Sequence, residues 1–281
     1  MIFRTLAIAL VASLASVVSA SAADTETKAR PLKHGHFHFE GIFGSYDADT
    51  LQRGFQVYRE VCSSCHSMDL VSFRNLGQPG GPFYLASCPE GVAEGVDCSN
   101  PNDNPIVKAI AAEYTVIDGP DDEGDMFERP GTPADRIPGP YANSNQARAA
   151  NGGAYPPDMS LLAKARHHGP HYIYSLLTGY GEEVPEHFEI AAGQYYNPWF
   201  EGWKLSMAPP LSDGIVDYEQ EDETFETVDQ YAQDVSEFLM WAAEPKLEQR
   251  KSTGFMVVIY LLIFTGILYL SYKQVWRNVE H

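Results

Sequence analysis

The sequence predicts a mainly α-helical exported domain that is attached to a membrane by one C-terminal transmembrane helix. Three observations lead to this prediction: a short apolar segment at the N-terminus, a longer one near the C-terminus, and amphipathic helical patterns between them. No convincing series of strands is present, and the connecting stretches are rich in Gly, Pro, Asp and Asn. The predicted domain is therefore helical with long loops.

The N-terminal segment has the features of a secretory signal peptide. Arg4 precedes an apolar stretch from Leu6 to Val18, and Ala20-Ser21-Ala22 provides the small residues of a cleavage site. Because the apolar stretch is too short to span a bilayer comfortably, we expect residues 1–22 to be removed. The remaining exported part, residues 23–254, has about 230 residues, which is enough for one sizeable core.

The first predicted helix contains one apolar face. Asp47 or Asp49 can cap it, and its apolar positions are spaced by four, three and four residues. These positions are Leu51, Phe55, Tyr58 and Cys62. From Gly77 to Pro140 the composition predicts long loops, with one short helix around Pro105 to Tyr114.

Three helices are predicted in the second half of the exported domain. Asp158 can cap a helix over Met159–Arg166, and Pro170 suits the first turn of a helix that stops at Gly179. Thr227 and Gln230 form a capping box for a third helix, which Pro245 ends.

The C-terminal apolar segment, Phe255 to Tyr272, has no formal charge. As a helix its 18 residues would measure about 27 Å, close to the ~30 Å hydrocarbon layer of a bilayer. Basic residues flank it on both sides, so the signal peptide decides the predicted orientation. We expect residues 23–254 on the periplasmic side, residues 255–272 in the membrane and residues 273–281 in the cytoplasm.

The chain is strongly acidic, with a formal net charge of −19. Removing the signal peptide, whose one charged residue is Arg4, takes this charge to −20. Much of the excess lies in residues 118–128, 182–189 and 213–229. Each run alone is equally well explained as a solvated surface, but together they argue against nucleic acid as a partner and for a cationic protein.

Residues 62–66 read Cys-Ser-Ser-Cys-His, a run typical of covalent attachment of a c-type haem. On one helical turn, the sulfurs of Cys62 and Cys65 can both reach the vinyl groups of one porphyrin, and His66 is then placed as an axial ligand of the iron. A redox pair of cysteines and a zinc site completed by Cys88 and Cys98 are the alternatives, but neither explains the histidine.

The second axial ligand is predicted to be Met207. It precedes Ala208-Pro209-Pro210 in a loop, where the prolines restrict the backbone and would hold the thioether in place. Met159 is the alternative, and an open iron position would instead favour ligand chemistry.

Two further groups of residues bear potential ligands. Cys88 and Cys98 are not needed by the haem, so we expect them to form a disulfide in the exported domain. Three histidines alternate near the mature N-terminus and would share one side of an extended segment: His34, His36 and His38. They indicate either a metal site or a mobile N-terminus.

Further motifs occur in a fixed order along the chain. They are Gly54-Phe-Gln-Val-Tyr, Asn151-Gly-Gly-Ala-Tyr-Pro-Pro-Asp, Ala163-Lys-Ala-Arg-His, Tyr172-Ile-Tyr-Ser-Leu-Leu-Thr-Gly-Tyr, Tyr196-Asn-Pro, Met207-Ala-Pro-Pro and Phe238-Leu-Met-Trp-Ala-Ala-Glu-Pro. This ordered set resembles the cytochrome c1 family, the haem subunit of the ubiquinol:cytochrome c oxidoreductase (bc1 complex), in its bacterial form. The resemblance runs from about Phe39 to the end of the membrane helix and is weaker between Gly77 and Asn143. It implies a class I c-type cytochrome fold with long loop insertions.

The resemblance also implies a function and partners. Electrons would pass from the Rieske iron-sulfur centre through one covalent haem c to a mobile or tethered c-type cytochrome, in respiratory or photosynthetic electron transport. The implied enzyme is a quinol–cytochrome c reductase in the bacterial inner membrane, in which this chain is an electron carrier without a substrate site. The implied partners are cytochrome b, the Rieske subunit, the lipid bilayer and an acceptor with a basic surface.

The resemblance assigns roles to residues around the haem as well. Arg166 would pair with a haem propionate, which agrees with the need of a buried carboxylate for a charged donor. Asn151 and Tyr172 would donate hydrogen bonds near the propionates, and Pro156 and Pro157 would pack against the ring. The alternatives are an ordinary surface arginine, a turn asparagine and a core tyrosine.

The sequence leaves two other functions open. A haem enzyme such as a peroxidase would need an accessible iron position, whereas a free-standing membrane-tethered cytochrome would have the same haem chemistry but no complex around it.

Overall fold

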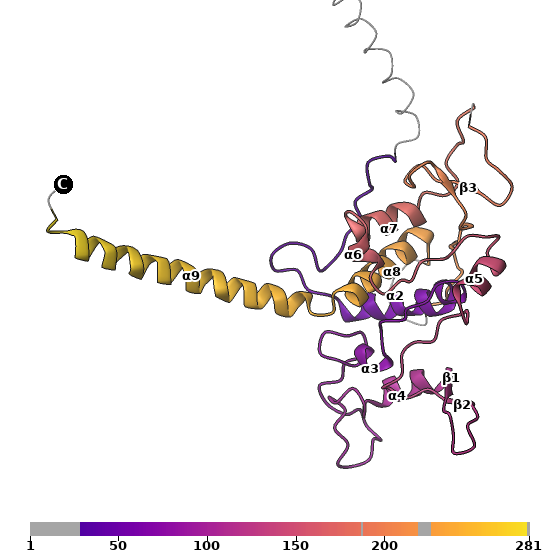
Figure 1. The fold of residues 1–281 in the computed structure, drawn as a ribbon, viewed down its shortest axis with the longest axis horizontal. Coiled ribbons are helices and arrows are strands. Elements are labelled where there is room, and N and C mark those ends of the chain that lie inside the picture. Colours follow the sequence, from indigo (N-terminus) through magenta and orange to yellow (C-terminus); the bar gives the residue numbers. More distant parts are fainter. Residues whose placement is uncertain (1–28, 187, 219–225, 280–281) are drawn as a thin grey trace, which may run out of the picture.

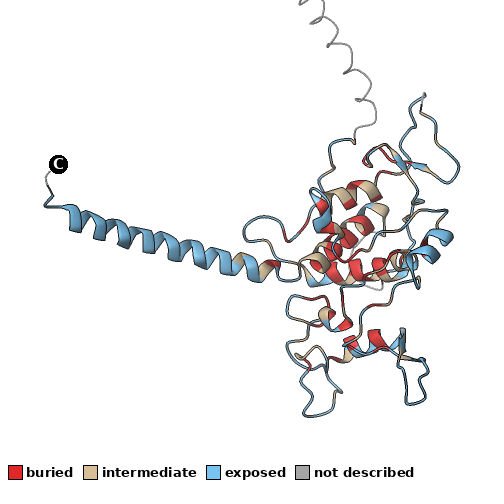
Figure 2. Cartoon of the chain, in the orientation of Figure 1, coloured by how far each residue is buried: buried red, intermediate tan, exposed pale blue. Residues whose placement is uncertain are grey.

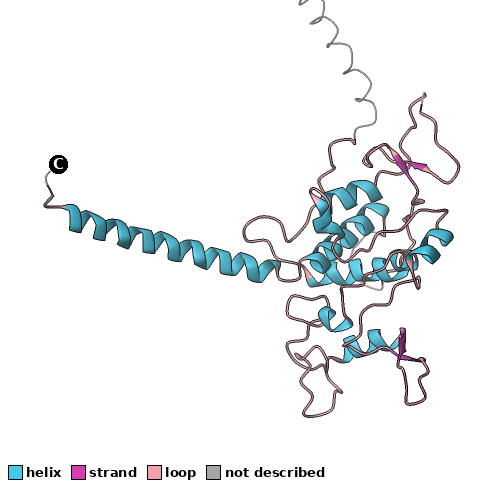
Figure 3. Cartoon of the chain, viewed as in Figure 1, coloured by secondary structure: helices cyan, strands magenta, loops and turns pink. Residues whose placement is uncertain are grey.

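The computed structural model describes residues 29–186, 188–218 and 226–279, so the predicted signal peptide lies outside the described residues. A small helical domain carries one long helix, α9, which extends away from it (Figure 1). Helices and long loops make up most of this domain, and the strands are short (Figure 3). The predicted fold class, mainly α with long loops and one C-terminal membrane helix, is confirmed.

The helices and strands follow in a simple order along the described chain. They are α2 (Ala48–Glu60), the 3-10 helix η1 (Cys62–Ser64), α3 (Phe73–Leu76), α4 (Pro105–Ala112), β1 (Thr115–Asp118), β2 (Phe127–Pro130), α5 (Ser144–Ala150), α6 (Leu162–Ala165), α7 (Gly169–Leu177), β3 (Tyr195–Tyr196), β4 (Lys204–Leu205), α8 (Val228–Ala243) and α9 (Leu247–Trp276).

Helix α2 begins and packs as its sequence predicts. The Asp47 carboxylate accepts a hydrogen bond from the backbone N–H of Thr50 at 2.9 Å and so caps the helix. Leu51, Phe55 and Tyr58, on the predicted apolar face, are all buried. The helix ends at Glu60, so the Cys-x-x-Cys turn follows it directly.

The crossing of α2 and α8 forms the centre of the core. A Cβ atom at Gly54 would lie 2.2 Å from the carbonyl oxygen of Asp234 and 2.6 Å from Cβ of Phe238, so this position has no room for a side chain. Close approach allows the rings of Phe55 and Phe238 to meet edge to face, with centroids 5.6 Å apart. Buried residues concentrate on these two helices and on α7 (Figure 2).

The capping predictions for the second half of the domain are mostly confirmed. Pro170 lies in the first turn of α7, and Thr227 accepts a hydrogen bond from the N–H of Gln230 at the start of α8. Only this half of the predicted capping box is found, because the Gln230 side chain donates to Asp234. The predicted helix over Met159–Arg166 is wrong in extent, because α6 covers only four residues and has no side-chain cap. The carboxylate of Asp158 instead binds groups near the haem motif.

The strands and two short helices were not predicted. Strands β1 and β2 pair antiparallel, as do β3 and β4. Each strand has two or four residues, too few for a period-two pattern to stand out. Helices α3 and α5 are similarly short, whereas α4 occurs where it was expected.

The loop before α4 contains the expected disulfide between Cys88 and Cys98, whose Cα atoms lie 5.1 Å apart. It joins two residues ten positions apart in a region with little regular structure.

The segment before α2 is extended and held in place. Phe37 and Phe39 are buried, and the three histidines that alternate with them are exposed. Backbone N–H groups of His36 and His38 donate to Gln233 and Glu237 of α8 at 3.0 and 3.2 Å. The histidine segment therefore packs on α8, whereas residues 23–28 of the predicted mobile N-terminus lie outside the described residues. Within the described residues no group of three or more His, Cys, Asp or Glu side chains is arranged to hold a metal ion, which argues against the metal site.

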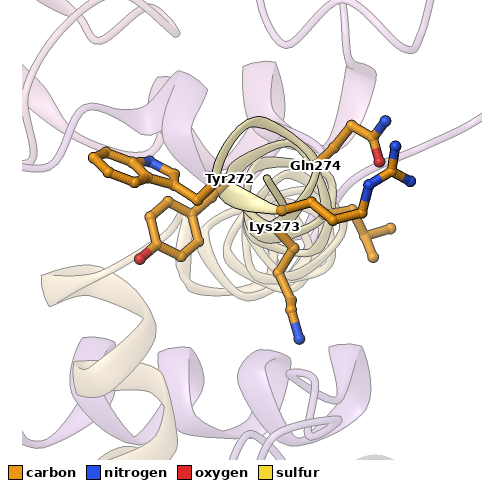
Figure 4. A pocket seen from close by; sticks show the side chains of 6 residues that line it. Tyr272, Lys273 and Gln274 are labelled. Carbon is orange, nitrogen blue, oxygen red and sulfur yellow. The ribbon is translucent and has the colours of Figure 1, made fainter. Parts of the chain in front are cut away.

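Helix α9 is the one candidate membrane span in the part of the chain that the structure describes. Its 30 residues measure about 45 Å, and it starts eight residues before the predicted span. Nearly all of it is exposed (Figure 2). Near its C-terminal end, side chains including Tyr272, Lys273 and Gln274 radiate from this helix alone (Figure 4). The shallow hollow between them is therefore no enclosed site; aromatic and basic side chains are typical of a membrane interface.

Candidate haem site

The two cysteines of the haem motif lie on one tight turn. The N–H groups of Cys65 and His66 both donate to the carbonyl of Cys62, at 3.1 and 2.9 Å. Both cysteines are free thiols and half-buried. Their placement on a single turn is what attachment to the two vinyl groups of one porphyrin requires.

His66 is buried and its ring is oriented by one hydrogen bond. Its Nδ1 lies 2.8 Å from the carbonyl oxygen of Pro157, so Nδ1 carries the proton and donates. This tautomer leaves the Nε2 lone pair available for iron, the usual arrangement for a metal-binding histidine. Burial lowers the pKa of His66, against the opposing effect of that hydrogen bond, and favours the neutral imidazole that binds metal.

A carboxylate fastens the Pro156-Pro157 segment to the chain after His66. Asp158 accepts hydrogen bonds from the Ser67 hydroxyl at 2.9 Å and from the Asp69 N–H at 2.8 Å, both through Oδ2. Its Oδ1 accepts from the Ser160 N–H at 2.9 Å. Asp158 thereby holds the carbonyl of Pro157 against the His66 ring.

We expect Asp158→Ala to loosen the axial histidine without removing it. Loss of three hydrogen bonds at a half-buried site should destabilise the domain by about 2–4 kcal/mol and raise the fraction of high-spin haem. Urea unfolding and the visible spectrum measure the two effects. Asp97→Ala, which removes an exposed carboxylate that accepts from the N–H and hydroxyl of Ser99, is the matched control. A spectrum equally altered in both variants would contradict this role of Asp158.

Met207, the predicted second ligand, lies in a loop beside the core. It is half-buried and packs against the main hydrophobic cluster, and the Tyr180 hydroxyl donates to its carbonyl at 3.0 Å. The strand pair β3–β4 ends two residues before it. Met159, the alternative, is buried, and its N–H donates to the carbonyl of Ser67 at 2.8 Å. Because Ser67 follows His66, this attachment places the Met159 backbone beside the residue predicted to be the first axial ligand.

The residues predicted near the propionates are only partly brought together. Arg166 is exposed and lies against Tyr172: burial raises the pKa of Tyr172, and a hydrogen bond with Arg166 opposes this effect. Asn151 ends α5, and its amide donates to the Ala147 carbonyl at 2.7 Å and to the Tyr141 hydroxyl at 3.0 Å. These contacts suit the alternative of a turn asparagine, while the exposed Arg166 and the half-buried Tyr172 remain a pair of donors.

The structure argues against the non-haem interpretations of the cysteines. Cys88 and Cys98 are joined to each other and cannot complete a zinc site with the haem motif. Burial, with a smaller contribution from Cys65, raises the pKa of the Cys62 thiol to about 12, whereas a redox-active pair needs a low-pKa thiolate. Two free thiols on one turn and a histidine with an available Nε2 therefore fit a covalent haem.

A sequence model of the Cytochrome C1 family matches residues 37–279. The chain belongs to the cytochrome c1 family. Cytochrome c1 is the haem-carrying electron-transfer subunit of the bc1 complex, and its haem c is covalently bound. The match covers the haem motif, Met207 and α9.

Related proteins agree with this assignment. Cytochrome c1 of Rhodospirillum rubrum is 44% identical over 288 residues, which cover 97% of each chain. A mitochondrial cytochrome c1 haem protein of Arabidopsis thaliana is 45% identical over 251 residues, 89% of this chain and 72% of the relative. The cytochrome b/c1 protein of Bradyrhizobium diazoefficiens is 45% identical over 258 residues, 85% of this chain, and the match spans 35% of that longer protein.

Sequence reasoning missed two groups that contact the predicted axial ligands or the segment beside them. Asp158 was given a role only as a helix cap, although it also ends the Asn151 motif directly after Pro157, which could have indicated a role beside the haem motif. Tyr180 was noted only as the last residue of the Tyr172 motif, because its contact with Met207 joins residues 27 positions apart.

Proposed function

We propose that this chain relays electrons from the Rieske iron-sulfur centre of a bc1 complex to a c-type cytochrome on the periplasmic side of a bacterial inner membrane. The whole complex would be a quinol–cytochrome c reductase, with cytochrome b as the other neighbour. The observation that supports this role most strongly is the buried His66, whose Nδ1 is held by Pro157 and whose Nε2 is available next to the Cys-x-x-Cys turn. Residues 23–254 would form the periplasmic domain and residues 273–281 the cytoplasmic tail.

The proposed roles follow from the chemistry of each side chain. Cys62 and Cys65 would attach the haem covalently, and His66 and Met207 would be its axial ligands. Arg166 would pair with a propionate, Tyr172 and Asn151 would donate nearby, and Pro156 and Pro157 would pack against the ring. When bound, haem c supplies a one-electron iron couple, and a methionine ligand raises its potential.

The protein around the ligands keeps this site suited to electron transfer. Asp158 and Pro157 hold His66 in one tautomer, so that ligand geometry need not change between redox states. Met207 closes the second axial position in this proposal, which would leave no iron position for peroxide or another substrate.

Membership of a complex is tested by purification. An affinity-tagged chain extracted in mild detergent should bring down cytochrome b and the Rieske protein in equal amounts. Recovery of the red chain alone, with both partners detected in the unbound fraction, would instead favour a free-standing tethered cytochrome.

An acidic loop next to the Met207 loop is the best candidate for docking the acceptor. It follows Tyr180, whose hydroxyl binds the Met207 carbonyl, and it contains three exposed glutamates: Glu182, Glu183 and Glu186. Glu182 also pairs with Arg30 at 3.0 Å. Most of the other predicted group, from Glu219 to Glu226, lies outside the described residues. Clustered carboxylates attract a cationic partner and speed its encounter at low salt.

We therefore expect electron transfer to a lysine-rich cytochrome to slow as salt rises. The Debye length falls from ~30 Å at 0.01 M to ~8 Å at 0.15 M ionic strength, which screens the attraction. Neutralising Glu182, Glu183 and Glu186 together should flatten this dependence and leave the haem spectrum unchanged.

Stopped-flow rate constants over a range of salt concentrations measure the effect. The matched control neutralises Asp121, Asp122 and Glu123 in the β1–β2 hairpin. These side chains are also exposed, but they are distant in sequence from the Met207 loop and from the acidic loop. Second-order rate constants independent of ionic strength in the parent protein would rule out electrostatic docking.

A further inference from the structure

One apolar loop of the domain is exposed beside the membrane helix. Residues Gly41–Gly44 connect the extended N-terminal segment to α2 and swing out alongside the start of α9 (Figure 1). Ile42 is 75% exposed and Phe43 is 85% exposed, and Phe43 has the largest exposed fraction of any large hydrophobic side chain among the described residues. Two adjacent side chains that are this exposed contribute little to the core. Their apolar surface therefore indicates a contact with a molecule outside this chain.

The loop is fastened to α9 by polar contacts at its base. The Lys251 ammonium donates to three backbone carbonyls of this region, those of Phe39, Gly41 and Gly44, with the last two at 2.7 and 2.9 Å. One helical turn earlier, the Glu248 carboxylate accepts from the Tyr46 N–H at 2.8 Å. The loop carbonyls are thus satisfied by a side chain of the helix itself, which fixes the loop against it.

The tip of the loop lies where the apolar part of α9 begins. The ring of Phe43 meets that of Phe255 edge to face, with centroids 6.3 Å apart. Phe255 is the first residue of the apolar segment, and Lys251 precedes it by four residues, about 6 Å along the helix axis. Lys251 therefore lies at the depth of lipid headgroups when Phe255 lies at the edge of the hydrocarbon layer.

We propose that this loop inserts Ile42 and Phe43 into the periplasmic boundary of the lipid bilayer, as a second membrane contact of the haem domain. The occupant is lipid, because the exposed tip is apolar, continuous with the membrane helix and level with the start of its apolar segment. Aromatic side chains are favourable at this depth, where apolar groups lie a few ångströms below the headgroups. Two contacts, the loop and α9, resist rotation of the domain about the helix axis in a way that a single helix does not.

Photo-crosslinking tests this proposal in the assembled protein. The photoreactive amino acid benzoylphenylalanine, which resembles phenylalanine, replaces Phe43 in the full chain. The complex is reconstituted in vesicles of phosphatidylcholine and phosphatidylglycerol and irradiated, and the adducts are identified by mass spectrometry. The same probe at Ile263, in the middle of α9, is the positive control. The probe at Ile117, which is 69% exposed on strand β1, is the matched surface control.

We expect lipid adducts at position 43 in a yield within about twofold of position 263 and about tenfold above position 117. An adduct with a peptide of another subunit would overturn the proposal, because the tip would then be a protein contact. A yield of lipid adducts at position 43 as low as the yield at position 117 would also overturn the proposal. The inference rests on α9 crossing the bilayer, which position 263 tests separately: lipid adducts there but not at position 43 would leave the anchor intact and reject the loop.

Discussion

Replacing Met207 by leucine is expected to lower the haem midpoint potential by roughly a few tenths of a volt, within the ~0.8 V range that axial ligands span. The covalent haem should remain, since Cys62, Cys65 and His66 are unchanged. Loss of the thioether removes the ligand that stabilises ferrous iron, so electrons from the Rieske centre would face an uphill step. Potentiometric titration followed by haem absorbance measures the change.

The matched control is Met159→Leu, which alters the other candidate methionine. Met159 is buried in the core, where a swap of similar volume should cost less than about 1.5 kcal/mol and leave the potential unchanged. An unchanged titration and spectrum in Met207→Leu would show that Met207 is not the ligand. A shift in Met159→Leu alone would transfer the assignment to Met159.

The second large effect is expected at the crossing of α2 and α8. Asp234 is fully buried and receives hydrogen bonds from Arg53 at 3.0 and 3.2 Å, from the Tyr218 hydroxyl at 3.0 Å and from Gln230 at 3.0 Å. Asp234→Ala removes the carboxylate beside a buried guanidinium. We expect the free energy of unfolding to fall by about 3–5 kcal/mol, as measured by urea titration.

Two comparisons separate the buried ion pair from a general effect of mutation. Asp103→Ala breaks an exposed pair with Lys108, 3.1 Å apart, and should cost less than about 1 kcal/mol. The double variant Arg53→Met, Asp234→Leu replaces both charges by apolar groups and should recover most of the stability lost in Asp234→Ala. No recovery in the double variant, or a loss in Asp234→Ala no larger than in Asp103→Ala, would contradict this account of the crossing.

Features that depend on neighbouring residues were predictable from the sequence. Asp47 and Thr227 cap the helices that follow them, because a cap and its donor lie within three residues of each other. The haem motif and the uncharged run of α9 are similarly local. Their periodicity and length indicate both a turn that holds two thiols and a helix that can cross a bilayer.

Features that depend on distant segments meeting could not be predicted. Arg53 and Asp234 are 181 residues apart, and nothing near either residue in the sequence shows that they form a pair. Gly54 appeared only as part of a family motif, although its physical role is to let two helices touch. The Asp158 carboxylate likewise accepts hydrogen bonds from residues 89 to 91 positions earlier in the chain. Its interpretation as a local helix cap therefore led to a predicted helix of the wrong extent.

The most direct test of the relay is a single-turnover experiment on the purified complex. Quinol is mixed rapidly with the oxidised complex and oxidised acceptor cytochrome, and the absorbance of haem c in this chain is followed separately from that of the acceptor. We expect the haem of this chain to become reduced before the acceptor and then to be reoxidised at the rate at which the acceptor is reduced. Reduction of the acceptor while this haem stays oxidised, at concentrations where all components are active, would contradict the relay.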